Sequence, residues 1–127
     1  MTKNPNKNAI ISLKNAKEFD IVSKHGSKRY GAYFLVVLAS DFTHIPSPES
    51  NPLFFGMKVS KKLSKKAVIR NKIKRRIRHL VRNMVNDTSI DTSHKALIII
   101  PKRGIENVEF KKIEDDFCNI LSVLRRW

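Results

Sequence analysis

The chain runs from Lys58 to Arg82 as KVSKKLSKKAVIRNKIKRRIRHLVR, a stretch with 12 of its 26 Lys and Arg residues and no Asp or Glu. No carboxylate side chain occurs anywhere between Glu49 and Asp87. A folded segment that is uniformly cationic needs something to offset the repulsion among its charges. A polyanion does so, because neutralising its phosphates releases condensed counterions and drives association. The stretch therefore predicts a nucleic-acid-binding protein.

The same stretch carries an apolar stripe at helical spacing, and we expect a helix over Lys65–Asn86. Its apolar residues share one narrow arc: Ile69, Ile73, Ile77, Leu80 and Met84. The opposite side carries Asn71, Lys74, Arg75, Arg78 and Arg82, with Lys72 at its flank. Solvated helices usually interleave Glu with Lys, because like charges four residues apart repel each other. The absence of acids therefore favours a phosphate-binding face over a merely solvated one.

Length, charge and cysteine content limit the class of protein. The 127 residues suit one domain that buries a core without a disulfide or a metal. The formal net charge of +15 indicates nucleic acid as the first choice of partner and an anionic membrane as the second. Cys118 is the single cysteine, and its amphipathic surroundings predict a reduced, partly buried thiol. The chain shows no membrane-span pattern and no secretory signal, so we expect a cytoplasmic protein.

The remaining patterns predict the order α-β-β-α-β-α in a two-layer α+β domain. Ser12 is the candidate N-cap of the first helix, and Gly26 fits just past its end. The basic helix either crosses over between parallel strands or spans a larger gap in a mixed sheet. The expected segments are a flexible basic arm over residues 1–10, a single RNA-binding domain over residues 11–127, a helix over Ile11–Lys24, strands over Arg29–Ala39, Leu53–Ser60 and Lys95–Pro101, and a closing helix from Phe110.

The basic helix closely resembles the signature of the bacterial ribonuclease P protein subunit. A Ser-Lys-Lys stretch leads into R-N-x-x-K-R-x-x-R over residues 70–78, and Phe19 and the Lys-His-Gly ending at Gly26 fit the same family. The resemblance implies an αβββαβα-type fold, ribosomal protein S5 domain 2-like, with about four strands in a mixed sheet and three helices. It also implies a left-handed crossover through the basic helix. A fourth, short strand is then expected near Ser27–Tyr30 or Val59–Lys61.

The resemblance implies that a large RNA, and not the protein, cleaves precursor tRNA to release its 5′ leader. The protein would bind this catalytic RNA and the leader without a cofactor of its own, while the RNA-containing holoenzyme requires Mg²⁺. The residues agree with this division, since hydrolysis of phosphodiesters by a protein usually needs clustered carboxylates that hold metal. The one acidic cluster, Glu114-Asp115-Asp116, is expected to be a solvated face. We therefore predict no catalytic and no metal-binding residue.

The four histidines, His25, His44, His79 and His94, form no metal-ligand pair at helical spacing. The predicted partners are thus the catalytic RNA subunit of ribonuclease P and precursor tRNA, with no membrane and no small-molecule substrate.

Two RNA-binding surfaces follow from the resemblance and from side-chain chemistry, because guanidinium groups grip phosphate in bidentate fashion and ammonium groups act as point charges. The surface for the catalytic RNA is predicted to comprise Lys61, Lys62, Arg70, Asn71, Lys72, Lys74, Arg75, Arg78 and Arg82. The leader cleft, between the first helix and the open sheet face, is predicted to be lined by Phe19, Tyr33, Leu35 and Val37. Ordinary core packing is the alternative for these four residues, and it is nearly as strong for Leu35 and Val37.

The chain departs from the family pattern at three positions that bear on these surfaces. Lys72 stands where Arg is common, and the charge is kept. Ser23 and Val37 stand where aromatic residues are common, and Tyr33 is the candidate replacement.

Three other functions are compatible with parts of the pattern. A ribosomal or other structural RNA-binding protein would share the size, charge and fold class. A helix-turn-helix DNA-binding protein is disfavoured, because a strand and not a helix is predicted directly before the basic helix. A protein-only nuclease would need a metal site that the sequence does not indicate.

Overall fold

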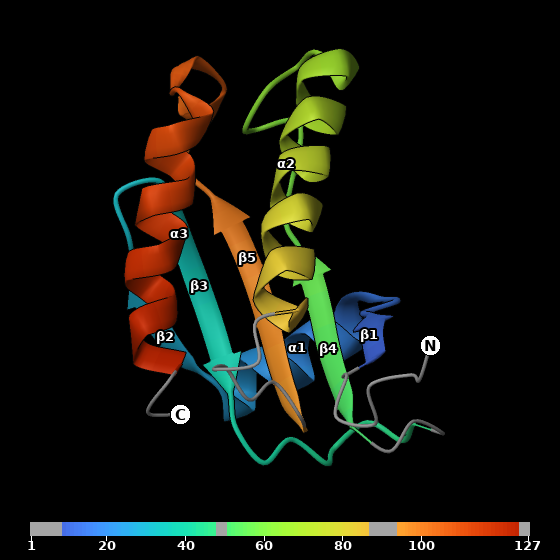
Figure 1. The fold of residues 1–127 in the computed structure, drawn as a ribbon. Helices are drawn as coiled ribbons and strands as arrows, with labels where there is room; N and C mark the ends of the chain where they lie inside the picture. Colours follow the sequence, from blue (N-terminus) through green and yellow to red (C-terminus); the bar gives the residue numbers. More distant parts are fainter. Residues whose placement is uncertain (1–8, 48–50, 87–93, 125–127) are drawn as a thin grey trace, which may run out of the picture.

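The computed structural model of the chain describes residues 9–47, 51–86 and 94–124. Within these ranges the chain forms five strands, three α-helices and one short 3-10 helix (Figure 1). In chain order they are β1 (Ala9–Ser12), α1 (Ala16–His25), β2 (Ser27–Tyr30), β3 (Phe34–Ala39), β4 (Pro52–Met57), α2 (Ala67–Asn86), β5 (Lys95–Pro101), η1 (Ile105–Asn107) and α3 (Phe110–Leu124). The predicted α+β class with three helices is confirmed.

The strands form one mixed sheet in the order β1-β4-β5-β3-β2. β1, β4 and β5 are parallel, and β3 is antiparallel to both β5 and β2. α2 and α3 lie side by side over one face, and this part matches the expected two layers (Figure 1). α1 crosses the other face near the end of β3 and the start of β5. The described sheet has one strand more than the four or so expected, and the additional strand is β1.

The connection from β4 through α2 to β5 is left-handed. β4 and β5 are parallel neighbours, with Phe54 paired to Ala96 and Phe55 to Leu97. In Figure 1 both strands point upward, β4 lies to the right of β5, and α2 lies in front of the sheet. The chain therefore moves leftward across the front face. Nearly all such crossovers are right-handed, so this feature, implied by the resemblance alone, is confirmed against the general rule.

The first segment differs from the prediction. Ile11 and Ser12, expected in a helix, lie in β1 and pair with Phe54 and Phe55 of β4. The helix begins later, because Asn15 is its N-cap and its side chain accepts the N–H of Glu18 at 3.0 Å. Two consecutive β-branched isoleucines suit a strand, and pairing with β4 decides the conformation.

The start of α1 affects two further predictions. Ser12 is therefore not the cap, whereas Gly26 does end α1 as predicted. Ala9 and Ile10, assigned to the basic arm, also belong to β1, and the rest of the arm lies outside the described residues.

The predicted strand Arg29–Ala39 is in fact a hairpin of β2 and β3. Its tight turn is closed by the N–H of Gly31, which donates to the carbonyl of Phe34 at 2.8 Å. β2 is the fourth, short strand that was expected near Ser27–Tyr30 or Val59–Lys61. It pairs with β3 from Ser27 opposite Leu38 to Tyr30 opposite Leu35. The break matters for function, because it decides on which face each aromatic side chain of this segment lies.

The core has one part on each face of the sheet. On the α2 and α3 side, Phe34, Val36 and Leu38 of β3 pack in one cluster with residues of both helices. On the α1 side, Val37 and Ala39 pack in a second cluster. The apolar arc predicted for the basic helix is confirmed, since Ile73, Ile77, Leu80 and Met84 are buried and Ile69 is half-buried. Each such side chain contributes roughly 1.5–3 kcal/mol when fully buried, which anchors α2 by its underside.

Candidate nucleic-acid interface

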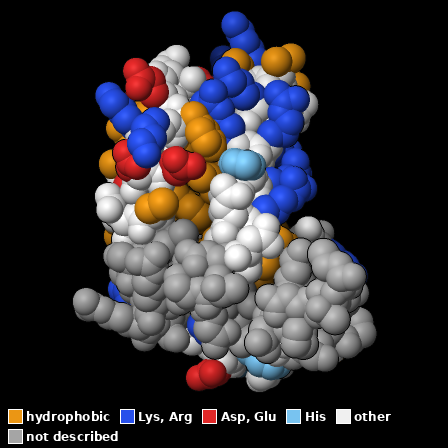
Figure 2. Space-filling view, in the orientation of Figure 1, with side chains coloured by type: hydrophobic (Ala, Val, Ile, Leu, Met, Phe, Trp, Pro, Cys, Tyr) orange, Lys and Arg blue, Asp and Glu red, His pale blue; other side chains and the backbone are white. Residues whose placement is uncertain are grey.

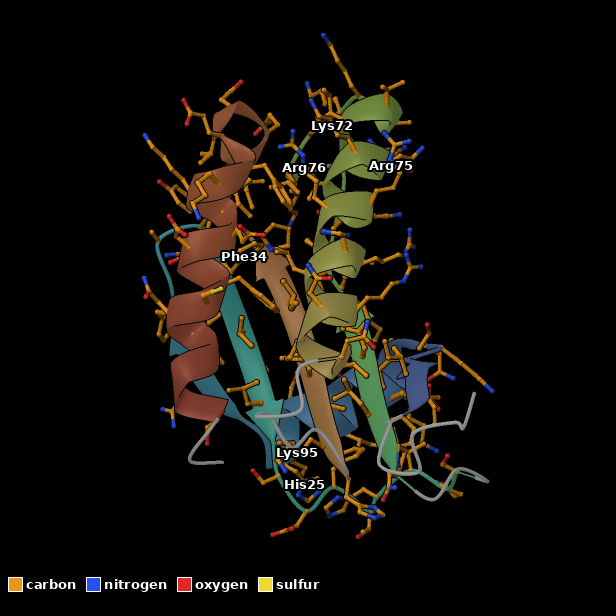
Figure 3. All side chains as sticks on the ribbon, viewed as in Figure 1. His25, Phe34, Lys72, Arg75, Arg76 and Lys95 are labelled. Carbon is orange, nitrogen blue, oxygen red and sulfur yellow. The ribbon has the colours of Figure 1, made fainter. Side chains whose placement is uncertain are left out.

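The outer side of α2 is a continuous cationic surface. We call this the basic surface, and its members are Asn71, Lys72, Lys74, Arg75, Arg78 and Arg82, all exposed except the half-buried Lys74. Lys and Arg side chains gather along α2 in Figure 2, and Lys72 and Arg75 project from it in Figure 3. The ion pairs between described residues lie on α3, where Lys111 meets Glu114 and Asp115, and none involves α2. Among the described residues, no carboxylate therefore neutralises the charges of the basic surface.

The other predicted RNA-binding residues are placed differently. Lys61 and Lys62 are exposed in the loop that precedes α2. Arg70 is half-buried and turned back, because its Nη1 atom donates to the carbonyl oxygens of Ser64 at 2.9 Å and Lys65 at 3.0 Å. The structure therefore brings six predicted residues together on α2 and separates Arg70 from them.

A groove of about 540 Å³ opens at the edge of the sheet between β1, α1, β4 and α2. Phe19 and Gly56 line one side of this edge groove, and Lys74, Arg78 and Arg82 of the basic surface line the other. Gly56 leaves room for this ring, since a Cβ at this position would lie 2.5 Å from Cζ of Phe19 and displace it. The edge groove places an aromatic ring and three cations around one space.

The sheet face that carries α1 is only partly covered by it. Beyond α1, strand pairing aligns Tyr30 with Leu35 and Leu35 with Ile100. Lys58 continues this line beyond β4, and its Nζ atom lies 5.8 Å from the centroid of the Phe19 ring. We call Tyr30, Leu35, Ile100 and Lys58 the open row, and the ring of Phe19 lies at its Lys58 end. Tyr30 is 71% exposed, while Leu35 and Ile100 are half-buried, so the open row presents an apolar strip with an aromatic side chain at each end.

The four residues predicted for the leader cleft are not brought together. Phe19 and Leu35 do lie on the α1 side of the sheet, but Val37 is 3% exposed and belongs to the core there. Tyr33 packs against the cluster on the opposite face, because the hairpin turn shifts the alternation of side chains. Tyr30 takes the place expected of Tyr33. Tyr30 would have been identified by applying the alternation of strand side chains separately to the residues before and after Gly31.

The acidic triplet on α3 is only in part the solvated face that was expected. Glu114 and Asp115 approach Lys111, whereas Asp116 is 9% exposed and accepts the N–H groups of Ala32 at 2.8 Å and Tyr33 at 2.9 Å. The triplet is split because consecutive helical positions point in different directions. Within residues 9–47, 51–86 and 94–124, no three His, Cys, Asp or Glu side chains are grouped as metal ligands would be.

Two further features were not predicted correctly or at all. Cys118, expected to be partly buried, is a free and exposed thiol. His25 and His44 stack with ring centroids 3.7 Å apart, and this partial removal from water, together with the charge of His44, lowers the pKa of His25. Among the described helices, none has the length and apolar content needed to cross a membrane.

An uninterrupted basic helix beside an apolar strip with an aromatic side chain at each end defines an RNA-binding protein of the α+β class. Comparisons with known proteins specify the family. Residues 8–125 match the family model described as Ribonuclease P. The ribonuclease P protein component of Rickettsia canadensis is 47% identical over 113 residues, which cover 89% of this chain and 96% of that protein. That of Rickettsia prowazekii is 47% identical over 112 residues, covering 88% and 93%.

Solved structures agree with this result. The Staphylococcus aureus RNase P protein superposes with a TM-score of 0.70 at 27% identity, covering 88% of this chain and 93% of that one. The protein from Thermotoga maritima gives a TM-score of 0.68 at 23% identity, covering 92% and 97%, and supports the fold alone. The chain belongs to the bacterial ribonuclease P protein family. It is the protein component of that tRNA-processing holoenzyme, and the RNase P RNA is its partner.

Proposed function

We propose that the chain binds two RNAs at once within the holoenzyme. The basic surface, with Lys61 and Lys62, holds the RNase P RNA, and the open row holds the 5′ leader of precursor tRNA. The observation that carries this proposal is the edge groove, where Phe19 and Gly56 lie opposite Lys74, Arg78 and Arg82. An RNA strand that follows the basic surface meets an aromatic ring in the same groove, so the two surfaces are continuous.

The contact with the RNase P RNA rests on charge. The residues of the basic surface have no acidic neighbours on α2, so phosphate is the group that neutralises them. Arginine at positions 75, 78 and 82 offers planar, bidentate contacts, and lysine at 72 and 74 offers point charges. Because these contacts address the backbone, they position the RNA without reading its sequence.

The contact with the leader rests on stacking. Bases of a single strand stack on aromatic side chains at about 1–3 kcal/mol each and tolerate any sequence. Phe19 and Tyr30 supply such rings at the two ends of the open row, and Leu35 and Ile100 supply apolar surface between them. Lys58 supplies a cation near the Phe19 end. Because mature tRNA has lost the leader, this contact stabilises the substrate complex and not the product complex.

In this proposal the chemistry belongs to the RNA and its Mg²⁺ ions, and the protein promotes endonucleolytic removal of the leader to give mature tRNA 5′ ends. The cations of the basic surface replace part of the positive charge that Mg²⁺ otherwise provides between two RNAs. The proposal places the chain in the cytoplasm with precursor tRNA. The expected consequence is a lower Mg²⁺ requirement for cleavage when the protein is present.

Reconstitution with RNase P RNA tests the proposal. Precursor tRNA cleavage at low Mg²⁺ should increase when the wild-type chain is added, and no stimulation would contradict the proposal. Phe19→Ala should weaken binding of precursor tRNA by about 5- to 150-fold, the equivalent of one lost base stack, while binding of mature tRNA is unchanged. Tyr30→Ala should act in the same direction, and Tyr30→Phe should restore binding. Equal losses for precursor and mature tRNA would remove the leader contact from the proposal.

Salt dependence tests the basic surface separately. Arg75→Ala and Arg78→Ala should each lower the log–log slope of RNA binding against salt by about 0.7–0.9, the value for one phosphate contact. Lys111→Ala is the matched control, because it removes one exposed charge from α3, away from the basic surface. An unchanged slope for both arginine variants would count against α2 as the RNA contact.

A further inference from the structure

The loop between β4 and α2 carries a dense group of lysines. Lys61, Lys62, Lys65 and Lys66 are all exposed within six residues. Ser60 folds the loop locally, because its carbonyl accepts the N–H of Leu63 at 3.0 Å and its Oγ accepts the N–H of Lys62 at 3.3 Å. The like charges of the four lysines repel one another, so a fixed shape of this loop needs a restraint from outside it.

Two arginines provide that restraint from opposite directions in the chain. Arg70, on the first turn of α2, donates from Nη1 to the carbonyl oxygens of Ser64 at 2.9 Å and Lys65 at 3.0 Å. Arg103, from the turn after β5, donates from Nη2 to the carbonyl of Lys62 at 3.0 Å across a separation of 41 residues. Both guanidinium groups therefore add positive charge to a loop that is already positive. If these two arginines served only to bind phosphate, their guanidinium groups would not be bonded to carbonyl oxygens of the loop.

The orientation of Arg70 separates it from the basic surface. It is half-buried, whereas Asn71 and Lys72 beside it are exposed. Its Nη1 atom is committed to two carbonyl oxygens, and the side chain lies back along the loop instead of outward.

We infer that Arg70 and Arg103 are positioning residues, which hold the loop Lys61–Lys66 in the shape that presents its lysines to RNA phosphates. Arg70 acts on RNA through this loop and makes no phosphate contact of its own. The inference rests on the proposed RNA surface and assigns a different role to one residue of the family signature. It follows that the geometry of the Arg70 guanidinium matters more than its charge, since an ammonium group cannot reproduce a planar donor pattern.

The test compares Arg70→Lys and Arg70→Ala in RNA binding over a range of salt, with Arg78→Ala as the contact variant and Lys111→Ala as the neutral control. Both Arg70 variants should lose about 5- to 10-fold in affinity, the equivalent of one net hydrogen bond, and Arg70→Lys should lose as much as Arg70→Ala although it keeps the charge. If Arg70 contacts phosphate instead, the Lys variant regains most of the affinity, and only the Ala variant lowers the slope by about 0.7–0.9. That result overturns the inference.

Amide hydrogen exchange of the free protein gives an independent readout. Arg70→Lys and Arg103→Lys should each raise exchange in residues 60–66 and leave the buried strands β3 and β5 protected, which shows that the fold is intact. Unchanged exchange in the loop overturns the inference. A failure of the proposed function looks different, since it leaves the salt slope of Arg78→Ala equal to that of the wild-type chain.

A third measurement distinguishes an indirect role from a direct one. In the Lys61→Ala/Lys62→Ala background, adding Arg70→Ala should cost less affinity than it does in the wild-type chain, because the groups that it positions are already absent. Additive losses contradict the inference.

Discussion

Asp116 connects α3 to the edge of the sheet, and its replacement gives a sharp test of how that edge is held. Its carboxylate is 9% exposed and accepts two backbone N–H groups, from Ala32 at 2.8 Å and Tyr33 at 2.9 Å. Gly31 leaves the space for it, since a Cβ there would lie 2.7 Å from Oδ2 of Asp116. Without the carboxylate, both N–H groups of the turn that joins β2 to β3 lose their acceptors.

The expected magnitude follows from these two bonds. A hydrogen bond to a charged group contributes about 1.5–3 kcal/mol, and water recovers part of the loss because the turn is only partly buried. We expect Asp116→Ala to lower the free energy of unfolding by about 3 kcal/mol. Asp116→Asn keeps the shape but sets one amide donor against a backbone donor, so about 2 kcal/mol is expected.

Urea unfolding monitored by circular dichroism measures these differences in the free energy of unfolding. In thermal unfolding, the Tm of the Ala variant should be lower than that of the wild-type chain by roughly 10 °C. Asp115→Ala is the matched control, because this neighbouring carboxylate is 60% exposed and lies 3.5 Å from Lys111. Its removal should change stability by less than about 0.5 kcal/mol. If Asp116→Asn is as stable as the wild-type chain, the two hydrogen bonds do not hold the hairpin and the reasoning is refuted.

Three further predictions concern other sites. Gly56→Ala should destabilise the chain by about 1–3 kcal/mol, because the added methyl group overlaps the ring of Phe19, and urea unfolding with a leader-binding assay would detect both effects. The pKa of His25 is lowered, so the neutral imidazole favours the fold at and above pH 6.5, and this stability is lost as the pH falls through the folded pKa. NMR titration should show a pKa of His25 below 6.5, and His44→Ala should bring this pKa back toward 6.5. Cys118 should react fully with a thiol reagent without denaturant, and a protected thiol would contradict its exposure.

The amphipathic helix was the part of the fold most accessible from sequence. Its buried arc from Ile73 to Met84 follows a single period over twenty residues, and the observed start at Ala67 differs from the prediction by two. β1 was missed because four residues carry too little periodicity to distinguish a strand from the start of a helix. Only pairing with β4, which lies some forty residues further along the chain, decides their conformation. The handedness of the crossover was likewise not accessible from local pattern.

The candidate site shows the same division between local and non-local information. The exposed residues of the basic surface were predictable, because helical geometry alone decides which side of α2 they occupy. The aromatic residues were not, because one turn at Gly31 exchanges the faces of Tyr30 and Tyr33. Arg70 was placed on the RNA surface from its charge and spacing. Its actual partners are backbone carbonyl oxygens, which no side-chain pattern reveals.

The shortness of β2 has a consequence for the protein before it meets RNA. An edge strand with free backbone groups is a template on which a second copy of a chain can add a strand and begin to aggregate. β2 is only four residues long and fully exposed, and it carries Lys28 and Arg29. An incoming copy would gain few hydrogen bonds and would bring the same charges into contact. The cationic character of β2 thus also guards the free subunit against self-association through this edge of its sheet.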